Sequence, residues 1–203
     1  MPLKLYTRKQ ILDACLAVFA RHGYNNTSAA MLAEAAGISK ALIFHHFKSK
    51  RELYLLVLHR CIEKVGQELA LNILPEHEDF FAAIDEFSRL KLAYYQKYPD
   101  EYKVVQEAFY NPPDELKAEI DQRFGTWLAA RDKMLEQLFS KVSLREGVER
   151  RQALELIKIV LDYMEEKYLA VLKADNNLDP GYWEGIIGEM NTFLTMIRYG
   201  IER

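Results

Sequence analysis

The positions of proline constrain the fold of this chain most strongly. All six prolines in the 203 residues fall between long stretches with the apolar period of helices, and no Asn-Gly or Asp-Gly pair marks a hairpin. Because proline interrupts a helix, these breaks divide the chain into helical segments. The sequence predicts an all-α fold of about nine helices, over 7–22, 28–36, 39–47, 49–73, 77–97, 100–110, 113–141, 145–173 and 180–201.

Helix starts are marked by side chains that can accept backbone N–H groups. Three pairs have the spacing of a capping box, and an Asp-Pro pair supplies an N-cap followed by proline at the first helical position. These signals are Thr7 with Gln10, Ser49 with Glu52, Ser143 with Glu146, and Asp179 with Pro180. Since Ser49 caps a helix at a change in composition, we expect two parts of the chain to share that helix.

Composition excludes disorder and an integral membrane protein. Half of the residues are apolar, yet no apolar run approaches the ~18 residues that would span a bilayer. Asp13 interrupts the apolar centre that a signal peptide would need, so we expect a cytoplasmic protein with no membrane contact. Cys15 and Cys61 lie on apolar helix faces, which favours buried free thiols.

The net charge of −3 conceals a split along the chain. Residues 1–51 hold eight Lys and Arg against two acidic residues, a net charge of +6, whereas the remainder carries −9. Such asymmetry suggests a basic part that meets a polyanion, although chance clustering on a solvated face is an alternative. The shift near residue 50 predicts a DNA-binding domain over 1–49 and a second domain over 50–203.

Residues 29–48 have the spacing of a helix-turn-helix. Ala33 is small enough for two helices to cross closely, and Gly37 can take the left-handed conformation that ends the first helix. Ser39 can cap the second helix, while Ile38 and Ile43 can seal the angle between the two. The sequence therefore predicts a helix-turn-helix here.

Charge distinguishes a DNA-binding helix-turn-helix from a helical hairpin that has only a structural role. Four cations cluster on and just beyond the second helix: Lys40, Lys48, Lys50 and Arg51. Because phosphates attract such clusters, we expect double-stranded DNA as the partner.

The run from Thr27 to Leu53 resembles the amino-terminal domain of TetR-family transcriptional regulators. The matching residues are Ala33, Ala36-Gly37-Ile38-Ser39-Lys40, Ile43-Phe44, His46-Phe47-Lys48 and Lys50, with Ile11, Ala14, Phe19, Gly23 and Tyr24 ahead of them. The resemblance implies that residues 39–47 form a recognition helix in the major groove. The sequence departs from the family pattern at 41–44, where Ala-Leu-Ile-Phe replaces the Gly-Thr-Leu-Tyr that is frequent in the family.

The resemblance also implies which residues meet DNA. Thr27 or Ser28, and Lys50, correspond to phosphate-contacting positions at helix starts. Lys40 and His45 are placed for base edges or nearby phosphates, and Leu42 for a thymine methyl group. The full predicted set is Thr27, Ser28, Ser39, Lys40, Ala41, Leu42, Phe44, His45, His46, Lys48 and Lys50.

Catalysis and cofactor binding find no support in the sequence. His45 and His46 are adjacent and point ~100° apart on a helix, so they cannot chelate one metal ion from one face. No G-x-S-x-G elbow, phosphate loop or H-E-x-x-H motif is present. We therefore expect no metal, no cofactor and no enzymatic activity.

Residues 77–141 carry an unusual number of aromatic side chains. Aromatic residues at helical spacing mostly form cores, but Tyr and Trp also carry polar tips suited to a ligand cavity. The family resemblance implies an inducer pocket formed by this region together with the helix near 49–73 and part of 145–173. A cavity lined by such side chains would suit an apolar or aromatic small-molecule effector, whose identity is unknown. Its predicted lining is Phe87, Tyr94, Phe109, Trp127, Met134 and Tyr163.

The last two predicted helices have apolar residues on more than one side. One side can face the helix's own domain, and the other then needs a partner. The resemblance implies a two-fold homodimer through these helices, whereas a hairpin buried inside a monomer is the alternative. The predicted interface is Leu156, Ile159, Val160, Tyr163, Trp183, Ile187, Met190, Leu194 and Ile197.

Together these patterns predict a ligand-responsive repressor that binds a pseudo-palindromic operator as a dimer and is released by its effector. An activator, or a regulator controlled by a protein partner without a small ligand, remains open. An enzyme that uses the helical cavity is the remote alternative.

Overall fold

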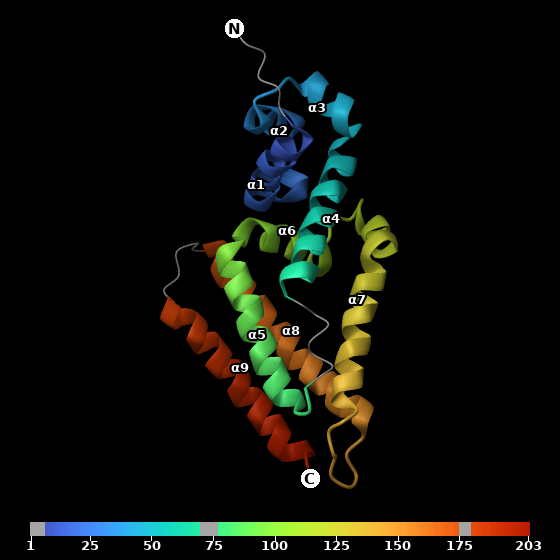
Figure 1. The fold of residues 1–203 in the computed structure, drawn as a ribbon, viewed down its shortest axis with the longest axis vertical. Coiled ribbons are helices and arrows are strands. Elements are labelled where there is room, and N and C mark those ends of the chain that lie inside the picture. Colours follow the sequence, from blue (N-terminus) through green and yellow to red (C-terminus); the bar gives the residue numbers. More distant parts are fainter. Residues whose placement is uncertain (1–6, 70–76, 175–179) are drawn as a thin grey trace. The chain divides into compact units, whose positions relative to one another are not determined.

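The structure, a computed structural model, describes residues 7–69, 77–174 and 180–203. Within these residues the predicted all-α fold is confirmed, and a single isolated bridge between Leu144 and Glu202 is the only β pairing described (Figure 1). The helices are α1 (Arg8–Asn26), α2 (Ala29–Ala36), α3 (Lys40–Phe47), α4 (Lys50–Glu68), α5 (Phe80–Lys97), α6 (Pro99–Tyr110), α7 (Lys117–Phe139), α8 (Arg150–Ala174) and α9 (Pro180–Ile201).

The chain forms two compact units whose limits cut across two helices. The first comprises Met1–Ala70 and Tyr94–Leu128, and the second comprises Leu71–Ala93 and Ala129–Arg203. The predicted domains, 1–49 and 50–203, do not coincide with these units. The reason is that α1 packs against α6 as well as against α2 and α4, which brings a later stretch of the chain into the first unit.

The first unit is built around aromatic side chains of α1 and α4. Phe19 and Tyr54 are almost completely buried, and their rings meet edge to face with centroids 5.1 Å apart. Ile43 and Phe47 of α3 join the same core, so the second helix of the predicted helix-turn-helix is anchored on its inner side. Figure 1 shows α1, α2 and α3 beside the first part of α4.

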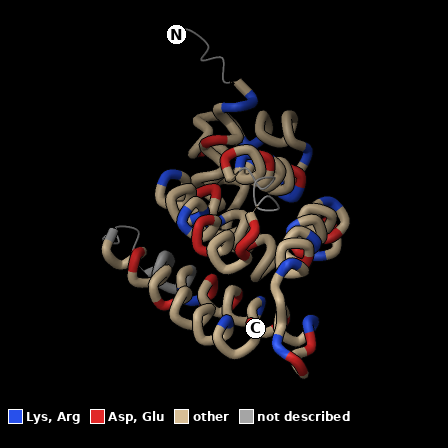
Figure 2. The backbone as a smooth tube through the Cα atoms, turned by 60° about the horizontal axis from the view of Figure 1, so that its bottom comes forward, with Lys and Arg blue, Asp and Glu red and all other residues tan. Residues whose placement is uncertain are grey.

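The second unit packs the first part of α5 and the second part of α7 against α8 and α9. Phe80 and Phe139 meet edge to face at 5.0 Å, and Ile157 and Leu194 complete the same core. The Arg150 guanidinium donates to the carbonyl of Phe139 at 2.7 Å, which ties the start of α8 to the end of α7. Figure 2 shows Lys and Arg interspersed with Asp and Glu along the helices.

Two of the predicted capping residues act as expected. Thr7 forms a reciprocal capping box with Gln10, and the Ser49 hydroxyl accepts the N–H of Glu52 at 3.1 Å. Asp179 lies outside the described residues.

The predicted helix start at Ser143 is wrong, because α8 begins at Arg150. Residues 143–145 instead run extended beside the end of the chain. The N–H of Arg145 donates to the carbonyl of Ile201 at 2.8 Å, and the N–H of Arg203 donates to that of Ser143 at 3.0 Å. Backbone pairing with the C-terminal segment therefore overrides the local capping signal.

Candidate nucleic-acid interface

The turn between α2 and α3 has the geometry that its sequence predicts. Gly37 takes φ 64° and ψ 27°, the left-handed conformation that ends α2. The Ser28 hydroxyl caps α2 by accepting the N–H of Met31 at 3.2 Å, and the Ser39 hydroxyl caps α3 by accepting that of Leu42 at 3.2 Å. Each helix of the motif thus starts on a serine cap.

Eight of the eleven predicted DNA-contact residues are exposed: Ser28, Ser39, Lys40, Ala41, Leu42, His45, His46 and Lys48. Leu42 is 40% exposed and leaves an apolar group beside polar neighbours. Lys40 and Lys48 make no ion pair in the described part of the chain, so both cations are available to an anionic partner. This surface can offer positive charge, imidazole donors and one apolar contact.

Lys48 holds an unusual backbone conformation at the end of α3. Its φ is 63°, the only positive φ of a non-glycine residue among those described, and its N–H donates to the carbonyl of Phe44 at 2.9 Å. A β-carbon makes this region unfavourable, so packing must hold the turn in place. The side chain projects into solvent directly after the exposed face of α3.

Thr27 and Phe44 do not present their side chains as predicted. Thr27 is 2% exposed, and its hydroxyl donates to the carbonyl of Gly23 at 2.6 Å. Phe44 is half-buried against the core of the first unit. The prediction of exposed contacts is corrected at both positions, because one side chain closes the end of α1 and the other packs inward.

Lys50 has an internal role that the sequence did not reveal. Its ammonium donates to the carbonyls of Tyr24 at 3.0 Å and Thr27 at 3.1 Å, and it lies 4.1 Å from the centre of the Tyr24 ring. The side chain therefore ties the start of α4 to the connection between α1 and α2. Its predicted phosphate contact stays a prediction, with one of the three ammonium donors uncommitted to these carbonyls.

Glu107 of α6 has a structural role that the sequence did not reveal. One carboxylate oxygen accepts the N–H of Tyr24 at 2.9 Å, and the other accepts the hydroxyl of Tyr54 at 2.9 Å. A β-carbon at Gly23, where φ is 71°, would lie 2.6 Å from the first oxygen. The hydroxyl of Tyr24 donates to Glu115. Only the glycine next to a buried tyrosine hinted at this close approach.

A charged cluster joins the start of α4 to the start of α7. Nε of Arg51 donates to one oxygen of Glu119 at 2.5 Å, and a second nitrogen of Arg51 contacts the same oxygen. Arg123 donates to the other oxygen of Glu119 and lies 3.1 Å from Glu52. Of the four predicted cations near α3, Lys40 and Lys48 are thus exposed with no ion pair among the described residues, whereas Lys50 and Arg51 are engaged by other groups of the chain.

The six predicted effector residues do not converge on one described cavity. Tyr94, Phe109 and Trp127 belong to the first unit, and Phe87, Met134 and Tyr163 belong to the second. Tyr163 is 52% exposed on α8, whereas Phe109 and Trp127 stack with centroids 5.6 Å apart. The predicted lining therefore stays a prediction.

Tyr94 is the polar group of this set with the clearest signature of a binding role. It is 4% exposed, and its hydroxyl has no hydrogen-bond partner among the residues that the structure describes. Burial raises the pKa of Tyr94, so the hydroxyl stays a neutral donor. A buried hydroxyl without a partner is costly in an empty core, and a ligand acceptor would remove that cost.

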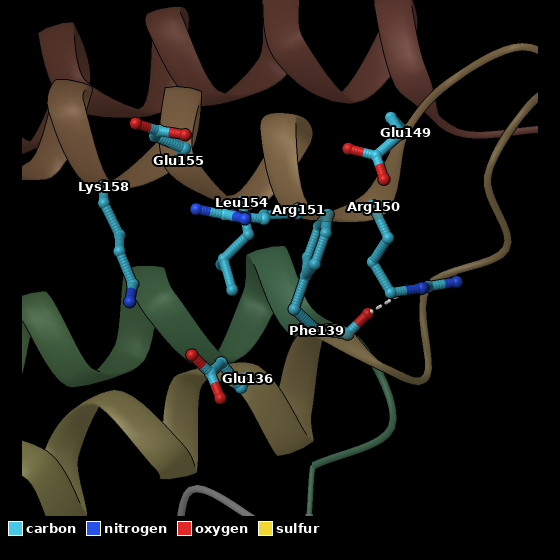
Figure 3. A pocket seen from close by; sticks show the side chains of 8 residues that line it. All are labelled: Glu136, Phe139, Glu149, Arg150, Arg151, Leu154, Glu155 and Lys158. Atoms are coloured by element: carbon cyan, nitrogen blue, oxygen red, sulfur yellow. Dashed lines mark hydrogen bonds between the residues drawn. The ribbon is translucent and has the colours of Figure 1, made fainter.

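The second unit contains a groove of about 550 Å³ between α7 and α8 (Figure 3). Its lining is mostly charged: Glu136, Phe139, Glu149, Arg150, Arg151, Leu154, Glu155 and Lys158. None of the predicted effector residues lines it, and its charge differs from the apolar or aromatic lining that the sequence predicts.

The predicted dimer interface is divided by the structure. On α8, Leu156, Ile159 and Tyr163 are 45, 59 and 52% exposed and follow one face of the helix. Val160 and Ile197 are half-buried.

On α9 four of the five predicted interface residues pack inside the chain itself, so their role in a dimer stays a prediction. Trp183, Ile187, Met190 and Leu194 are all at most 6% exposed within the chain itself. The exposed face instead carries small residues followed by two large ones: Gly185, Gly188, Thr192, Met196 and Tyr199.

Comparison with known families agrees with this architecture. Residues 11–57 match the family described as bacterial regulatory proteins, tetR family, and residues 78–202 match the tetracyclin repressor-like C-terminal domain. The chain belongs to the TetR family. Members of this family are transcriptional regulators, and the matched relatives are not enzymes, as the sequence predicts.

The curated relatives of this TetR-family chain include a transcriptional regulator, an activator and a repressor. The regulator RutR of Escherichia coli is 33% identical over 126 residues, which cover 57% of this chain and 58% of RutR. The activator FasR of Mycolicibacterium smegmatis is 27% identical over 72% of this chain and 63% of its own length. The repressor AcnR of Corynebacterium efficiens is 30% identical over 50% and 61%. The chain thus spans about three fifths of the length of these relatives.

Solved structures share the fold of the TetR-family chain. The fatty acid degradation regulator FadR of Bacillus halodurans superposes with a TM-score of 0.66 at 19% identity, covering 94% of this chain and 96% of FadR. A TetR-like regulator of Rhodococcus sp. RHA1 gives a TM-score of 0.64 at 19% identity, with 91% of each chain covered.

Among the described residues, no helix is long and apolar enough to cross a membrane, and no three potential metal ligands lie close together.

Proposed function

We propose that the protein is a cytoplasmic, ligand-responsive transcriptional repressor that binds a pseudo-palindromic operator as a two-fold homodimer. The observation that carries this proposal is the exposed face of α3, which follows a serine-capped turn, begins at Lys40 and is followed by Lys48. Neither lysine has an ion pair among the described residues. A short helix anchored by Ile43 and Phe47 on its inner side and exposed on its outer side suits insertion into a major groove.

A homodimer would present two copies of α3 to the same face of the duplex. The exposed stripe of Leu156, Ile159 and Tyr163 on α8 offers an apolar surface that water covers in the isolated chain. On α9, Gly185 and Gly188 would let a second helix approach closely. Half-sites are then expected one helical turn apart, ~34–36 Å, or a small multiple of it.

The effector proposed is a small, largely apolar or aromatic molecule with a hydrogen-bond acceptor. The partnerless hydroxyl of Tyr94 supports the acceptor, and the stacked rings of Phe109 and Trp127 support the apolar part. Such a molecule would release the operator if it bound more tightly to a conformer with poor DNA affinity.

Selection of bound genomic fragments by the full chain tests the proposal. We expect enrichment of a pseudo-palindrome, and we expect the double variant Lys40→Ala/Lys48→Ala to lose the enrichment while it remains folded. Failure to enrich any sequence, or enrichment by the double variant equal to that of the wild type, would overturn the proposal.

Activation is a second candidate, because FasR, an activator by name, matches 72% of this chain. Transcription in vitro from a promoter that carries the selected operator separates the two. A repressor lowers transcript yield as protein is added, and an activator raises it.

A further inference from the structure

Arg51 lies in the first turn of α4, directly after the position predicted to meet a DNA phosphate, yet its guanidinium is held by an acid. We propose that Glu119 lowers operator affinity by competing with a DNA phosphate for Arg51. This inference rests on the proposed DNA-binding function and assigns to Glu119, which lies in α7, the role of an affinity-setting residue.

The contact occupies the part of Arg51 that a phosphate would use. Nε and one terminal nitrogen both face a single oxygen of Glu119. These two nitrogens form the edge of the guanidinium that binds carboxylates and phosphates through paired hydrogen bonds. Phosphate can therefore bind that edge only after the carboxylate has released it.

The carboxylate is held more firmly than the arginine. The Glu119 side chain is 14% exposed and that of Arg51 is 51% exposed. The second oxygen of Glu119 is engaged by Arg123, which also pairs with Glu52. Because Arg51 and Arg123 hold Glu119 from two sides, its carboxylate remains in place while the exposed Arg51 can exchange partners.

Glu119 also keeps its charge across the neutral range. The hydrogen bond from Arg51 is the main cause that holds the pKa of this carboxyl below its usual value. Glu119 therefore competes for Arg51 at any pH near neutrality at which the protein would meet DNA. Arg51 contributes to the net positive charge of residues 1–51, but its guanidinium is already paired.

The variant Glu119→Gln in the full chain tests this role. We expect its operator affinity to rise about three- to tenfold at moderate salt, and the slope of log K against log salt to steepen by about 0.9 per bound chain. The matched control is Asp121→Asn, which removes the same charge from an exposed residue two positions along α7 that has no ion pair in the described part. The control should change affinity less than twofold and leave the slope unchanged.

A double-mutant cycle assigns the gain to Arg51. Arg51→Ala alone should leave the slope nearly unchanged, whereas Arg51→Ala in the Glu119→Gln background should abolish the gain. Equal affinities for Glu119→Gln and Asp121→Asn, or weaker binding by Glu119→Gln, would overturn the proposal. So would a gain that survives the loss of Arg51.

Two further readings keep the outcome unambiguous. Circular dichroism melting shows whether Glu119→Gln is folded. If it is not, Arg51→Ala in the wild-type background still tests the proposal, because a shallower slope of log K against log salt in that variant would contradict it. A wild-type protein that binds no DNA would instead refute the proposed function itself.

Discussion

The carboxylate of Glu107 in α6 accepts the backbone N–H of Tyr24 at the end of α1, with 2.9 Å between oxygen and nitrogen. The carbonyl of the same tyrosine accepts from Lys50, and its hydroxyl donates to Glu115. Every polar group of Tyr24 is therefore engaged by a different later segment. This residue joins the first helix to α4, α6 and the connection before α7.

Removing the Glu107 carboxylate should destabilise the first unit. Glu107→Ala leaves the N–H of Tyr24 and the hydroxyl of Tyr54 without acceptors in a buried site. We expect the free energy of unfolding in urea to fall by about 2–4 kcal/mol, since each such group costs ~1–3 kcal/mol. Glu107→Gln, which retains one acceptor, should lose less than half as much, and an equal loss in the two variants would contradict the hydrogen-bond explanation.

Gly23 should tolerate no side chain. In Gly23→Ala the new β-carbon would lie 2.6 Å from the Glu107 carboxylate, and φ is 71°, so we expect a loss of about 2 kcal/mol. Gly66→Ala in α4 is the control, because no described atom beyond the adjacent residues and the nearby backbone of α4 lies within 4 Å of the added carbon. That variant should gain up to ~1 kcal/mol from helix propensity. Thermal melting of the two variants gives the comparison.

Lys50 and Lys48 should differ in what their loss affects. Lys50→Met removes the donor of two carbonyls, so we expect a stability loss of about 1–2 kcal/mol together with weaker DNA binding. Lys48→Ala should leave stability within ~0.5 kcal/mol and make the salt slope shallower by about 0.9 per bound chain. If Lys50→Met proved as stable as the wild type, the internal role of Lys50 would be excluded.

The two buried thiols should make the protein less stable at alkaline pH. Burial raises the pKa of Cys15 and of Cys61 from 9.0 to about 12. Each thiol binds its proton more tightly in the folded chain, so the stabilisation is complete below pH 9 and is lost as pH rises toward 12. Urea unfolding at pH 8, 9 and 10 should show a falling midpoint, with a smaller fall in Cys61→Ala. An unchanged midpoint would contradict thiol burial.

The exposed stripe on α8 should govern assembly. Ile159→Glu places a charge at a side chain that is 59% exposed, so the chain should fold but sediment as a monomer. Leu90→Glu on α5, at 48% exposure, is the control and should leave the dimer intact. Dimerisation by Ile159→Glu equal to that of the wild type would exclude this face.

Local signals predicted the helix-turn-helix well. Ser28, Gly37 and Ser39 act through neighbours within four residues, so the sequence alone specifies the caps and the turn. By contrast, the roles of Lys50 and Glu107 depend on contacts between residues 26 and 83 positions apart, which no periodic pattern encodes. An acid in an amphipathic helix is ordinarily solvated, and Glu107 carries no local sign that it is an exception.

The sequence could not assign the burial of the apolar residues of α9, for a related reason. Large apolar residues such as Trp183 and Met190 indicate burial, but they do not say whether the chain itself or a second copy provides it. The small exposed residues Gly185 and Gly188 had no apolar signal at all. Only the packed structure separates the inward face from the outward one.

Salt-dependent binding of the selected operator tests the central claim most directly. Fluorescence anisotropy should show that the wild-type chain binds the operator duplex more tightly than a scrambled duplex. The slope of log K against log salt should be about −3 to −4 or steeper for four exposed lysines in a dimer. In Lys40→Ala/Lys48→Ala that slope should become shallower by about 3 to 4. Binding that is insensitive to salt, or equally tight in the double variant, would contradict a DNA interface on α3.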